Sequence, residues 1–494
     1  MTANPIKRLA GQTAVYGLSS IIGRLLNYLL VPIYTRLFIP EVYGVVTELY
    51  AYVSFLLILL TYGTETGYFR FAQDKERFAT TYSTLLSSLA VSSLAFIGLI
   101  SIFIHPIASA MQYTAHPEYI IWMAVIVAID AFISIPFARL RLEGKAMKFA
   151  SLKLINIAIN IAMNLYFLLL CPYIASKNPE SLFLIIWSPG IGVGYVFISN
   201  LIANITTLLM FIPSFIKVKY RFDVQLLKQL LLYSFPLLIA GFAGMINETL
   251  DRILLKYCLP DQVNAMEQIG IYGANYKLAI LMTLFVQMFR YAADPFFFAE
   301  AKKSDAKATY ALVMKYFVIG GLFLFLGVML YLDFVKYFID PEYHSGLMVV
   351  PVLLMANLFL GMYYNMSIWY KLNDKTIYGA YIAIIGAFIT IALNVALIPF
   401  FGFIGSAWAT FICYLTMFII SYLLGQKHYP VKYPVKAILL YFVVALVIYF
   451  ISIVIPPTTV FLHYAFNTVL FVAFGIFVVI REGLYKKYIL PKLR

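Results

Sequence analysis

Charged side chains are scarce in this 494-residue chain. They make up 12% of its residues, whereas 63% are hydrophobic and 17% are aromatic. A soluble globular domain carries about 25% charged residues, and the mean hydropathy here is +0.90. The shortage of charge therefore excludes an ordinary soluble fold and indicates an integral membrane protein.

Cysteine and the motifs of catalysis are sparse as well. The three cysteines are far apart and show no CxxC spacing, so neither a disulfide framework nor a zinc site is expected. The five histidines occur singly, and we expect no bound metal or cofactor. No phosphate-binding loop of the form GxxxxGK followed by Ser or Thr occurs, so the chain is not itself an ATPase.

Loops able to hold an active site are short. The two largest outer loops lie near residues 171–187 and 256–269. Neither carries paired carboxylates or a nucleophile beside a base, which are the usual parts of a catalytic site. The sequence therefore favours a transporter without catalytic residues over a membrane enzyme.

Apolar runs, in contrast, cover almost the whole chain. A bilayer core about 30 Å thick needs roughly 20 apolar residues per helix, and the runs show none of the alternation that a membrane β-barrel requires. We therefore predict an all-α fold. Its fourteen membrane-spanning helices are expected near residues 11–35, 42–64, 81–104, 117–138, 151–171, 188–213, 229–256, 270–290, 309–332, 346–369, 376–399, 403–425, 435–455 and 460–481.

The positive charge is unevenly distributed. The net charge is +14, and most lysines and arginines fall in alternate loops, for example at Arg139, Arg141, Lys145 and Lys148. This is the positive-inside pattern, and it places both termini in the cytoplasm of a multi-pass protein. The basic character therefore reflects topology and contact with membrane lipids, and nucleic acid is not an expected partner.

The chain contains an internal repeat. The segment YGVVTEL at 43–49 aligns with YGANYKL at 272–278, and FRFAQD at 69–74 aligns with FRYAAD at 289–294. Because the repeat unit holds six spans, an even number, both copies enter the membrane in the same direction. Their symmetry axis is then a pseudo-two-fold axis along the membrane normal.

This repeat divides the chain into four parts. We expect an N-terminal six-helix lobe at 1–216, a cytoplasmic linker at 217–228 and a C-terminal six-helix lobe at 229–425. Residues 426–494 then form two additional spans and a basic tail. The linker could instead form an amphipathic helix on the cytoplasmic surface.

A few charges lie inside predicted spans, where burying one costs about 2.5–3.5 kcal/mol on insertion scales. We interpret Arg24, Lys277 and Glu48 as lining a hydrated cavity, with Asn27 one turn from Arg24. The repeat sets Glu48 opposite Lys277, so these two could alternatively form only a latch between the lobes. Glu48 or Asp130 could bind a coupling ion, although Asp130 could simply pair with Arg139 or cap its helix.

Four further arginines lie at span ends. Arg36 and Arg252 occupy outer ends, and Arg70 and Arg290 occupy cytoplasmic ends. Each could bind a lipid headgroup at a gate. The alternatives are snorkelling for the outer pair, and helix-end ion pairs with the aspartates four residues later for the cytoplasmic pair.

Three segments resemble a known family. They are GRLLNYLLVPIYTRLFIPEVYG at 23–44, RLRLEGKAMKFASLKLINIAINIAMNL at 139–165 and LNVALIPFFGFIGSAWATFICY at 393–414. They are similar to Wzx-type flippases of polysaccharide and O-antigen repeats, in the multidrug/oligosaccharidyl-lipid/polysaccharide exporter (MATE-like) superfamily. The likeness covers most of residues 10–425.

This resemblance implies translocation of a polyprenyl-diphosphate-linked oligosaccharide to the outer leaflet of a bacterial inner membrane, for cell-surface polysaccharide biosynthesis. It also implies alternating access and coupling to an ion gradient, with Na⁺ or H⁺ as the ion. We further expect a monomer, with other polysaccharide-assembly proteins as partners. The family's cavity cations match Arg24 and Lys277. Relatives that flip a peptidoglycan precursor place a further cation where this chain has Glu48.

Two other functions remain open. A cation-coupled multidrug antiporter of the same superfamily is one, although buried cations at Arg24 and Lys277 would repel cationic drugs. The other is a membrane-embedded polysaccharide polymerase or ligase, although this chain lacks the large outer loop that such enzymes need.

Overall fold

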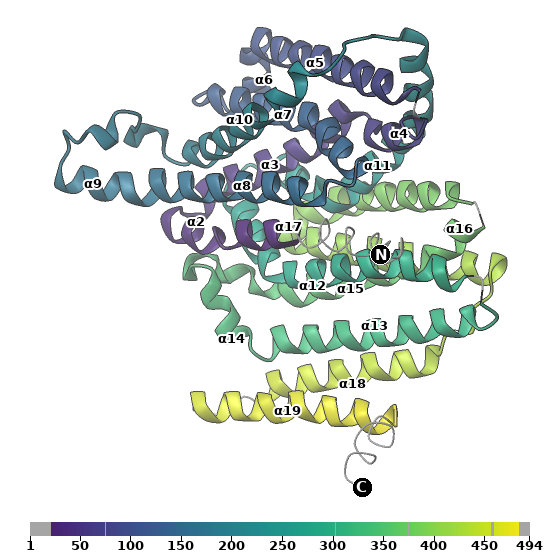
Figure 1. Cartoon of the computed structure of the whole chain (residues 1–494). Coiled ribbons are helices and arrows are strands. Elements are labelled where there is room, and N and C mark those ends of the chain that lie inside the picture. Colours follow the sequence, from purple (N-terminus) through teal and green to yellow (C-terminus); the bar gives the residue numbers. More distant parts are fainter. Residues whose placement is uncertain (1–20, 75, 302, 374, 456–458, 484–494) are drawn as a thin grey trace. The chain divides into compact units, whose positions relative to one another are not determined.

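Long helices account for nearly all of the chain. The computed structural model describes residues 21–74, 76–301, 303–373, 375–455 and 459–483, and no strand occurs among them (Figure 1). Twelve helices in this part are long and apolar enough to cross a membrane. The predicted all-α membrane fold is therefore confirmed.

In the part of the chain that the structure describes, the N-terminal half starts with a helical stretch. Residues 21–28 are helical, and they are followed by α2 (Val31–Leu37), α3 (Pro40–Thr61), α4 (Thr64–Phe71), α5 (Phe78–Ile102), α6 (Ile104–Ala110), α7 (Pro117–Leu142), α8 (Ala146–Leu165), α9 (Cys171–Lys177) and α10 (Gly194–Ile216). A five-residue π-helix, Tyr166–Leu170, joins α8 to α9 without a break.

The C-terminal half contains longer helices. They are α11 (Val224–Cys258), α12 (Ala265–Glu300), α13 (Ala306–Met329), α14 (Leu332–Val335), α15 (Val350–Met366), α16 (Ile368–Leu372), α17 (Ile377–His428), α18 (Val435–Val454) and α19 (Val460–Arg481). The 3₁₀ segment η5 (Pro341–Val349) leads into α15.

Whether the number of helices equals the predicted fourteen spans depends on two segments of the chain. The backbone of α17 is non-helical at Gly402, with φ +55° and ψ −138°, a conformation that glycine adopts more readily than other residues. This break falls between the spans predicted at 376–399 and 403–425. The span predicted at 11–35 begins outside the described residues, so the count of fourteen stays a prediction.

Helix contacts divide the chain into two compact units. Unit 1 comprises Met1–Gly273 with Ala387–Phe403, and unit 2 comprises Ala274–Gly386 with Ile404–Arg494. The predicted lobes at 1–216 and 229–425 follow the repeat instead, and their boundaries stay a prediction.

The predicted linker is not a continuous helix. Residue 217 forms a turn and residues 218–223 have no regular structure. Helix α11 begins at Val224, and the Asp223 carboxylate accepts a hydrogen bond from the Leu226 backbone N–H at 2.9 Å. This is an ordinary N-cap. An amphipathic helix over 217–228 is therefore wrong for its first seven positions.

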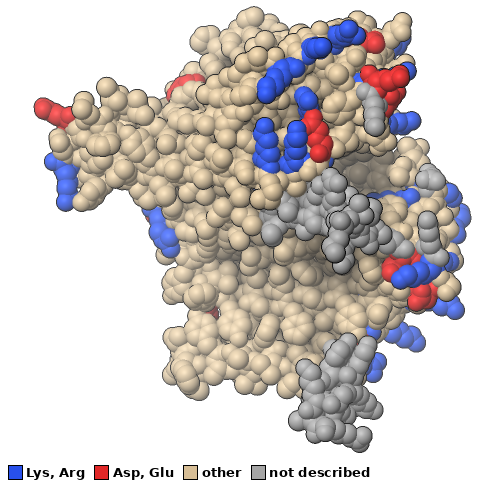
Figure 2. Space-filling view, viewed as in Figure 1, with Lys and Arg blue, Asp and Glu red and all other residues tan. Residues whose placement is uncertain are grey.

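Unit 1 packs around α7, which contacts α3, α5, α8 and α10. Tyr68, Tyr82, Leu85, Ile135 and Leu230 form one of its buried clusters, each at most 1% exposed. In unit 2, α13 contacts α15, α18 and α19. Elsewhere the helices present large apolar side chains outward, and the face in Figure 2 is mostly uncharged. An apolar exterior of this kind suits lipid.

The repeat is visible in hydrogen bonds as well as in sequence. In the first copy, Asn160 of α8 donates to Asn27 at 3.1 Å. In the second copy, Thr390 of α17 donates to Asn247 of α11 at 3.3 Å. Asn160 and Thr390 correspond under the alignment that also matches Asn164 with Asn394. Equivalent helix pairs are thus held by equivalent polar bonds, as interhelical contacts in membranes commonly are.

Candidate functional site

A buried ion pair in unit 1 is formed by Glu48 and Lys256. Pro40 at the first position of α3 fixes where the helix begins, and Glu48 follows two turns later with 0% of its surface exposed. The Lys256 ammonium of α11 lies 3.0 Å from Glu48 Oε2, and its side chain is 3% exposed. This ion pair is almost completely shielded from solvent and connects α3 directly to α11.

A third residue completes this group. The Tyr113 hydroxyl, in the segment between α6 and α7, donates to the same Glu48 oxygen at 2.6 Å. The Lys256 ammonium also donates to the Met111 carbonyl at 2.7 Å and lies 4.3 Å from the centre of the Tyr113 ring. We call Glu48, Lys256 and Tyr113 the outer latch, because the positive-inside pattern predicts that this end of the helices faces outward.

The outer latch is incompletely satisfied and locally strained. Glu48 Oε1 is buried and has no hydrogen-bond partner among the described residues. Gln112, between Met111 and Tyr113, has φ +58°, which is uncommon for a residue other than glycine. Burial raises the pKa of the Tyr113 phenol, so its hydroxyl stays protonated and acts as a donor to Glu48. Strain of this kind is typical of functional segments.

Glycines bring another helix against the same end of α3. A Cβ on Gly44 would overlap the Met266 carbonyl, and one on Gly270 would overlap the Pro40 carbonyl. The first turns of α12 thus lie in backbone contact with α3, one turn from Glu48. We call this contact of Gly44 with Gly270 the glycine seam.

The structure changes the predicted partner of Glu48. The sequence repeat suggested Lys277, whereas the ion pair that the structure shows is with Lys256. Lys277 is half-buried and belongs to unit 2, so its place beside the residues of unit 1 stays a prediction. Sequence reasoning missed Lys256 because a lysine near a helix end ordinarily snorkels to water.

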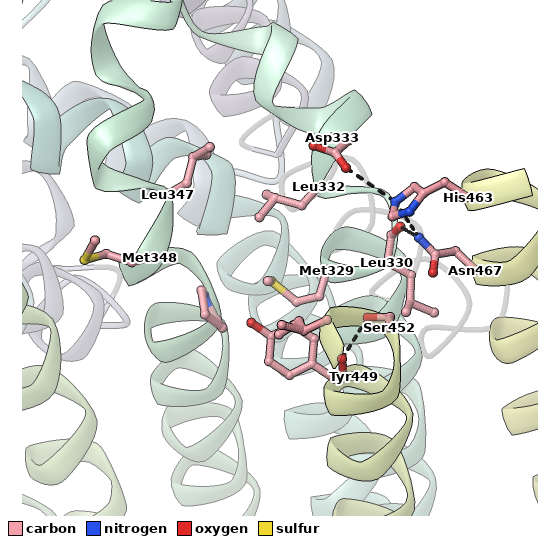
Figure 3. Close-up of a pocket in the computed structure, with 12 residues that line it drawn as sticks. Met329, Leu330, Leu332, Asp333, Leu347, Met348, Tyr449, Ser452, His463 and Asn467 are labelled. Atoms are coloured by element: carbon pink, nitrogen blue, oxygen red, sulfur yellow. Dashed lines mark hydrogen bonds and ion pairs between the residues drawn. The ribbon is translucent and has the colours of Figure 1, made fainter. Parts of the chain in front are cut away.

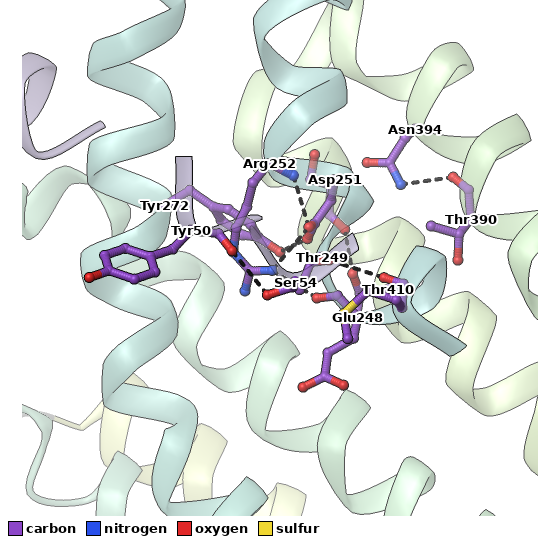
Figure 4. Close-up of polar contacts among 12 residues, drawn as sticks. Tyr50, Ser54, Glu248, Thr249, Asp251, Arg252, Tyr272, Thr390, Asn394 and Thr410 are labelled. Atoms are coloured by element: carbon purple, nitrogen blue, oxygen red, sulfur yellow. Dashed lines mark hydrogen bonds and ion pairs between the residues drawn. The ribbon is translucent and has the colours of Figure 1, made fainter. Parts of the chain in front are cut away.

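A second polar cluster lies on α11 and α12. The Tyr272 hydroxyl donates to Asp251 Oδ2 at 2.6 Å, and Arg252 Nη1 donates to the Glu248 carbonyl at 2.8 Å. Figure 4 shows Asp251 and Arg252 turned toward Tyr272. Arg252 is only 9% exposed, so snorkelling is wrong for this residue. Its predicted role in binding a headgroup stays untested.

Asp130 lies in a third polar group, formed by α7, α8 and α10. Asn204 donates to Asp130 at 3.0 Å, Asn156 donates to Asn204 at 3.0 Å, and Lys153 acts electrostatically on Asp130. Arg139, the partner considered from the sequence, bonds Glu143 instead at 2.6 Å. Asp130 therefore belongs to an internal network and does not cap its helix.

Arg24 and Asn27 share an exposed helical stretch. Both side chains are exposed, and Asn27 accepts the bond from Asn160 described above. Arg36 is exposed too, and its Nη1 bonds the Pro32 carbonyl at 3.3 Å. The structure therefore leaves Arg24 and Arg36 at the surface of unit 1, while Glu48 is enclosed.

The two cytoplasmic arginines have aromatic partners. The Arg70 guanidinium lies 4.4 Å from the centre of the Tyr233 ring, and that of Arg290 lies 4.6 Å from the Tyr364 ring. Asp74 pairs with Arg77 at 3.7 Å instead of with Arg70. The structure thus shows a cation–π contact for each of these equivalent arginines.

Unit 2 contains a pocket of about 460 Å³ near the predicted outer ends of α13, α18 and α19. In Figure 3, His463 lies between Asp333 and Asn467. His463 Nε2 is 3.3 Å from Asp333 Oδ2 and 3.0 Å from Asn467 Nδ2. Among the described residues, no group of three or more His, Cys, Asp or Glu side chains could hold a metal ion.

Comparisons with known proteins agree on the fold. The family model described as "Polysaccharide biosynthesis protein" matches residues 9–300. The lipid II flippase MurJ in an inward closed conformation matches with a TM-score of 0.66 and 15% identity, covering 95% of this chain and 99% of that chain. No curated protein matches.

Transporters of the MATE family have the same fold. An inward-facing multidrug resistance MATE transporter of the MOP superfamily matches with a TM-score of 0.65 and 14% identity, over 86% of this chain and 98% of that one. An outward-facing MATE transporter gives a TM-score of 0.58, 14% identity and the same coverages.

Proposed function

The chain belongs to the polysaccharide biosynthesis protein family, and from that premise we propose the cargo of this membrane transporter. It is a flippase that moves a polyprenyl-diphosphate-linked oligosaccharide from the cytoplasmic to the outer leaflet by alternating access. The family match over residues 9–300 carries the proposal. The fold shared with the lipid II flippase MurJ supports a lipid-linked cargo.

The cationic side chains of the spans supply the recognition. A diphosphate takes bidentate bonds from guanidinium groups and single bonds from ammonium groups. Arg24, with Asn27 beside it, and Lys277 provide these donors, and Arg36, Arg70, Arg252 and Arg290 are candidates for headgroup contacts at the gates. Since a cation inside a span is costly without a partner, an anionic cargo offsets that cost.

Coupling to an ion gradient is part of the proposal. Glu48 and Asp130 are the candidate acids, and each has a lysine nearby, Lys256 and Lys153 respectively. An ammonium beside the carboxylate occupies the place that Na⁺ would need. This arrangement favours H⁺ over Na⁺ as the coupling ion.

The cellular setting follows from the same premise. We place the protein in the inner membrane of a bacterium, as a monomer with both termini in the cytoplasm, contacting membrane lipids and other polysaccharide-assembly proteins. The positive-inside distribution of lysine and arginine supports this orientation.

Arg24 provides the direct test. In a strain that depends on this chain for surface glycan, Arg24→Ala should lower glycan by about tenfold or more, the equivalent of one charge-assisted hydrogen bond. Arg24→Lys should retain part of the glycan. Arg77→Ala, which removes an exposed arginine paired with Asp74, is the matched control.

Protein level in the membrane is measured for every variant. Full surface glycan with Arg24→Ala at normal protein level would contradict the role of Arg24. If the whole chain supports export of cationic drugs and no movement of polyprenyl-diphosphate glycan in proteoliposomes, the multidrug antiporter is correct and the flippase is not.

A further inference from the structure

The donors of the outer latch have the chemistry of an anion site. An ammonium from Lys256 and a phenolic hydroxyl from Tyr113 converge on one carboxylate oxygen, at 3.0 Å and 2.6 Å. The ammonium has no acceptor, and the phenolic hydroxyl directs its proton toward Glu48. Carboxylate and phosphate oxygens accept the same charge-assisted bonds, so these donors suit either anion.

Glu48 is an imperfect occupant of this site. Only Oε2 is bonded, whereas Oε1 is buried without a partner among the described residues. Leaving a buried polar atom unsatisfied costs free energy, and more so for a charged group. Replacing this carboxylate with another anion is therefore less costly than breaking a fully satisfied pair.

The surrounding structure is arranged so that the site can open. The Met111 carbonyl and the Tyr113 hydroxyl both come from the short segment that carries the left-handed Gln112. Outward movement of this segment would uncover Lys256 and relieve the strain at Gln112. The hydroxyls of Tyr52 and Tyr257, 3.0 Å apart, join α3 to α11 one turn further along α3 from its outer end, so the latch is the outer of two links.

We propose that Lys256 and Tyr113 form an exit subsite for a phosphate group of the departing headgroup, which the Glu48 carboxylate occupies while the outer end is closed. This proposal rests on the proposed flippase function. When Glu48 swings away, the ammonium and the hydroxyl are released to an incoming phosphate oxygen. When the phosphate leaves, Glu48 takes its place and closes the outer end again.

A purely structural ion pair makes a different prediction. Removing one partner of a buried pair leaves the other charge uncompensated, which strongly destabilises a protein. In an exit subsite, the uncompensated Lys256 instead gains affinity for an added anion. Anion affinity in variants of Glu48 therefore separates the two interpretations.

The experiment uses the full chain in lipid nanodiscs, with inorganic pyrophosphate and geranylgeranyl diphosphate as probes. Glu48→Gln should bind both probes about tenfold more tightly than wild type, the equivalent of one charge-assisted bond. Lys256→Met, alone or combined with Glu48→Gln, should abolish this gain. Geranylgeraniol, which has no phosphate, should show no gain in any variant.

Matched variants guard against trivial effects. Lys177→Met removes an exposed lysine of α9 that stacks on Tyr173, and it should bind both probes as wild type does. If Glu48→Gln does not fold, Glu48→Asp keeps the charge and shortens the reach of the carboxylate. It should also tighten probe binding, and Lys256→Met should cancel that effect.

The outcomes distinguish this proposal from the proposed function. Unchanged probe affinity in Glu48→Gln or Glu48→Asp, or a gain that survives Lys256→Met, would overturn the exit subsite. A gain with pyrophosphate alone would show a site for free phosphate instead of a lipid headgroup, and would overturn the lipid-linked assignment. Wild-type protein that binds the probes as expected but moves no lipid-linked glycan would overturn the flippase function only.

Discussion

A single buried carboxylate oxygen in unit 1 accepts two hydrogen bonds. Glu48 Oε2 accepts from both Lys256 and Tyr113, while Oε1 has no partner among the described residues. Buried ion pairs add little net stability because desolvation offsets their attraction, but breaking one is costly. Such a pair therefore favours a specific closed arrangement more than it stabilises the fold.

The hydroxyl of Tyr113 can be tested separately from the charges. Tyr113→Phe removes one donor to a buried carboxylate and keeps the ring against Lys256, so we expect a loss of about 1.5–3 kcal/mol of stability. Thermal unfolding in detergent measures it. Tyr173→Phe, at an exposed tyrosine of α9, serves as the control.

Sequence reasoning located one of the three residues of the outer latch, Glu48. Glu48 stands out because it is an acid inside an apolar run, where burial demands a partner. Its partners were hidden, since Lys256 lies 208 residues away at a helix end and Tyr113 is one of 39 tyrosines. No local sequence pattern identifies partners this far apart. Pairing each buried acid with the basic residues at the outer ends of other spans would have included Lys256 among the candidates.

At the scale of helices, the glycine seam determines how closely α3 and α12 approach. Without side chains at Gly44 and Gly270, the two backbones come into direct contact, as small residues allow between membrane helices. Glu48 lies on the next turn of α3. The seam therefore positions the carboxylate as well as joining the helices.

Gly44→Ala should separate these two helices. The added Cβ meets the Met266 carbonyl, which is backbone and cannot rotate away, so we expect overpacking to destabilise by about 1–3 kcal/mol. Gly98→Ala on α5 is the matched control, because nothing lies within 4 Å of its Cβ. There alanine should be neutral or stabilise by up to about 1 kcal/mol.

Thermal unfolding measures the change in stability, and the labelling rate of a cysteine placed at Gln112 measures how readily the latch opens. Faster labelling in Gly44→Ala than in Gly98→Ala is expected if the seam keeps the latch closed. Equal stability and equal labelling rates in the two variants would mean that α3 and α12 do not need this contact.

For the whole molecule, composition and periodicity predicted the fold class correctly. Apolar runs of about 20 residues admit little besides membrane helices, so the all-α architecture follows from hydropathy alone. The grouping of the helices into two compact units did not follow from hydropathy. The sequence repeat places 387–403 in the second lobe, whereas helix contacts place Ala387–Phe403 in unit 1, because packing between helices leaves no signal in a single sequence.

The last two helices are held to unit 2 by Glu482. Its carboxylate accepts from Lys315 of α13 and from Tyr441 of α18, the latter at 2.6 Å. Burial by itself raises the pKa of Glu482, but the hydrogen bonds from Lys315 and Tyr441 outweigh it and lower that pKa below its ordinary value of 4.5. The ionised carboxylate is thus favoured by the fold.

This pKa shift predicts a pH dependence of stability. A lowered pKa contributes stability that is fully present above the ordinary value of 4.5 and is lost as the pH falls through the lowered value. Glu482→Gln should therefore unfold more easily at pH 7 and lose less stability on acidification than wild type. Hydrogen exchange of α19, followed from about pH 7 down through the lowered pKa to about pH 3, measures the difference. Parallel pH profiles for both proteins would contradict it.

The strained residue Gln112 also makes the latch accessible to an added binding protein. Its side chain is exposed, the Met111 carbonyl bonds Lys256 and Tyr113 is part of the latch, so in the proposed orientation a molecule on the outer side of the membrane can bind there without crossing the bilayer. A nanobody that binds the segment around Gln112 when the latch is closed would inhibit transport. One that binds this segment only when the latch is open would report on the transport cycle.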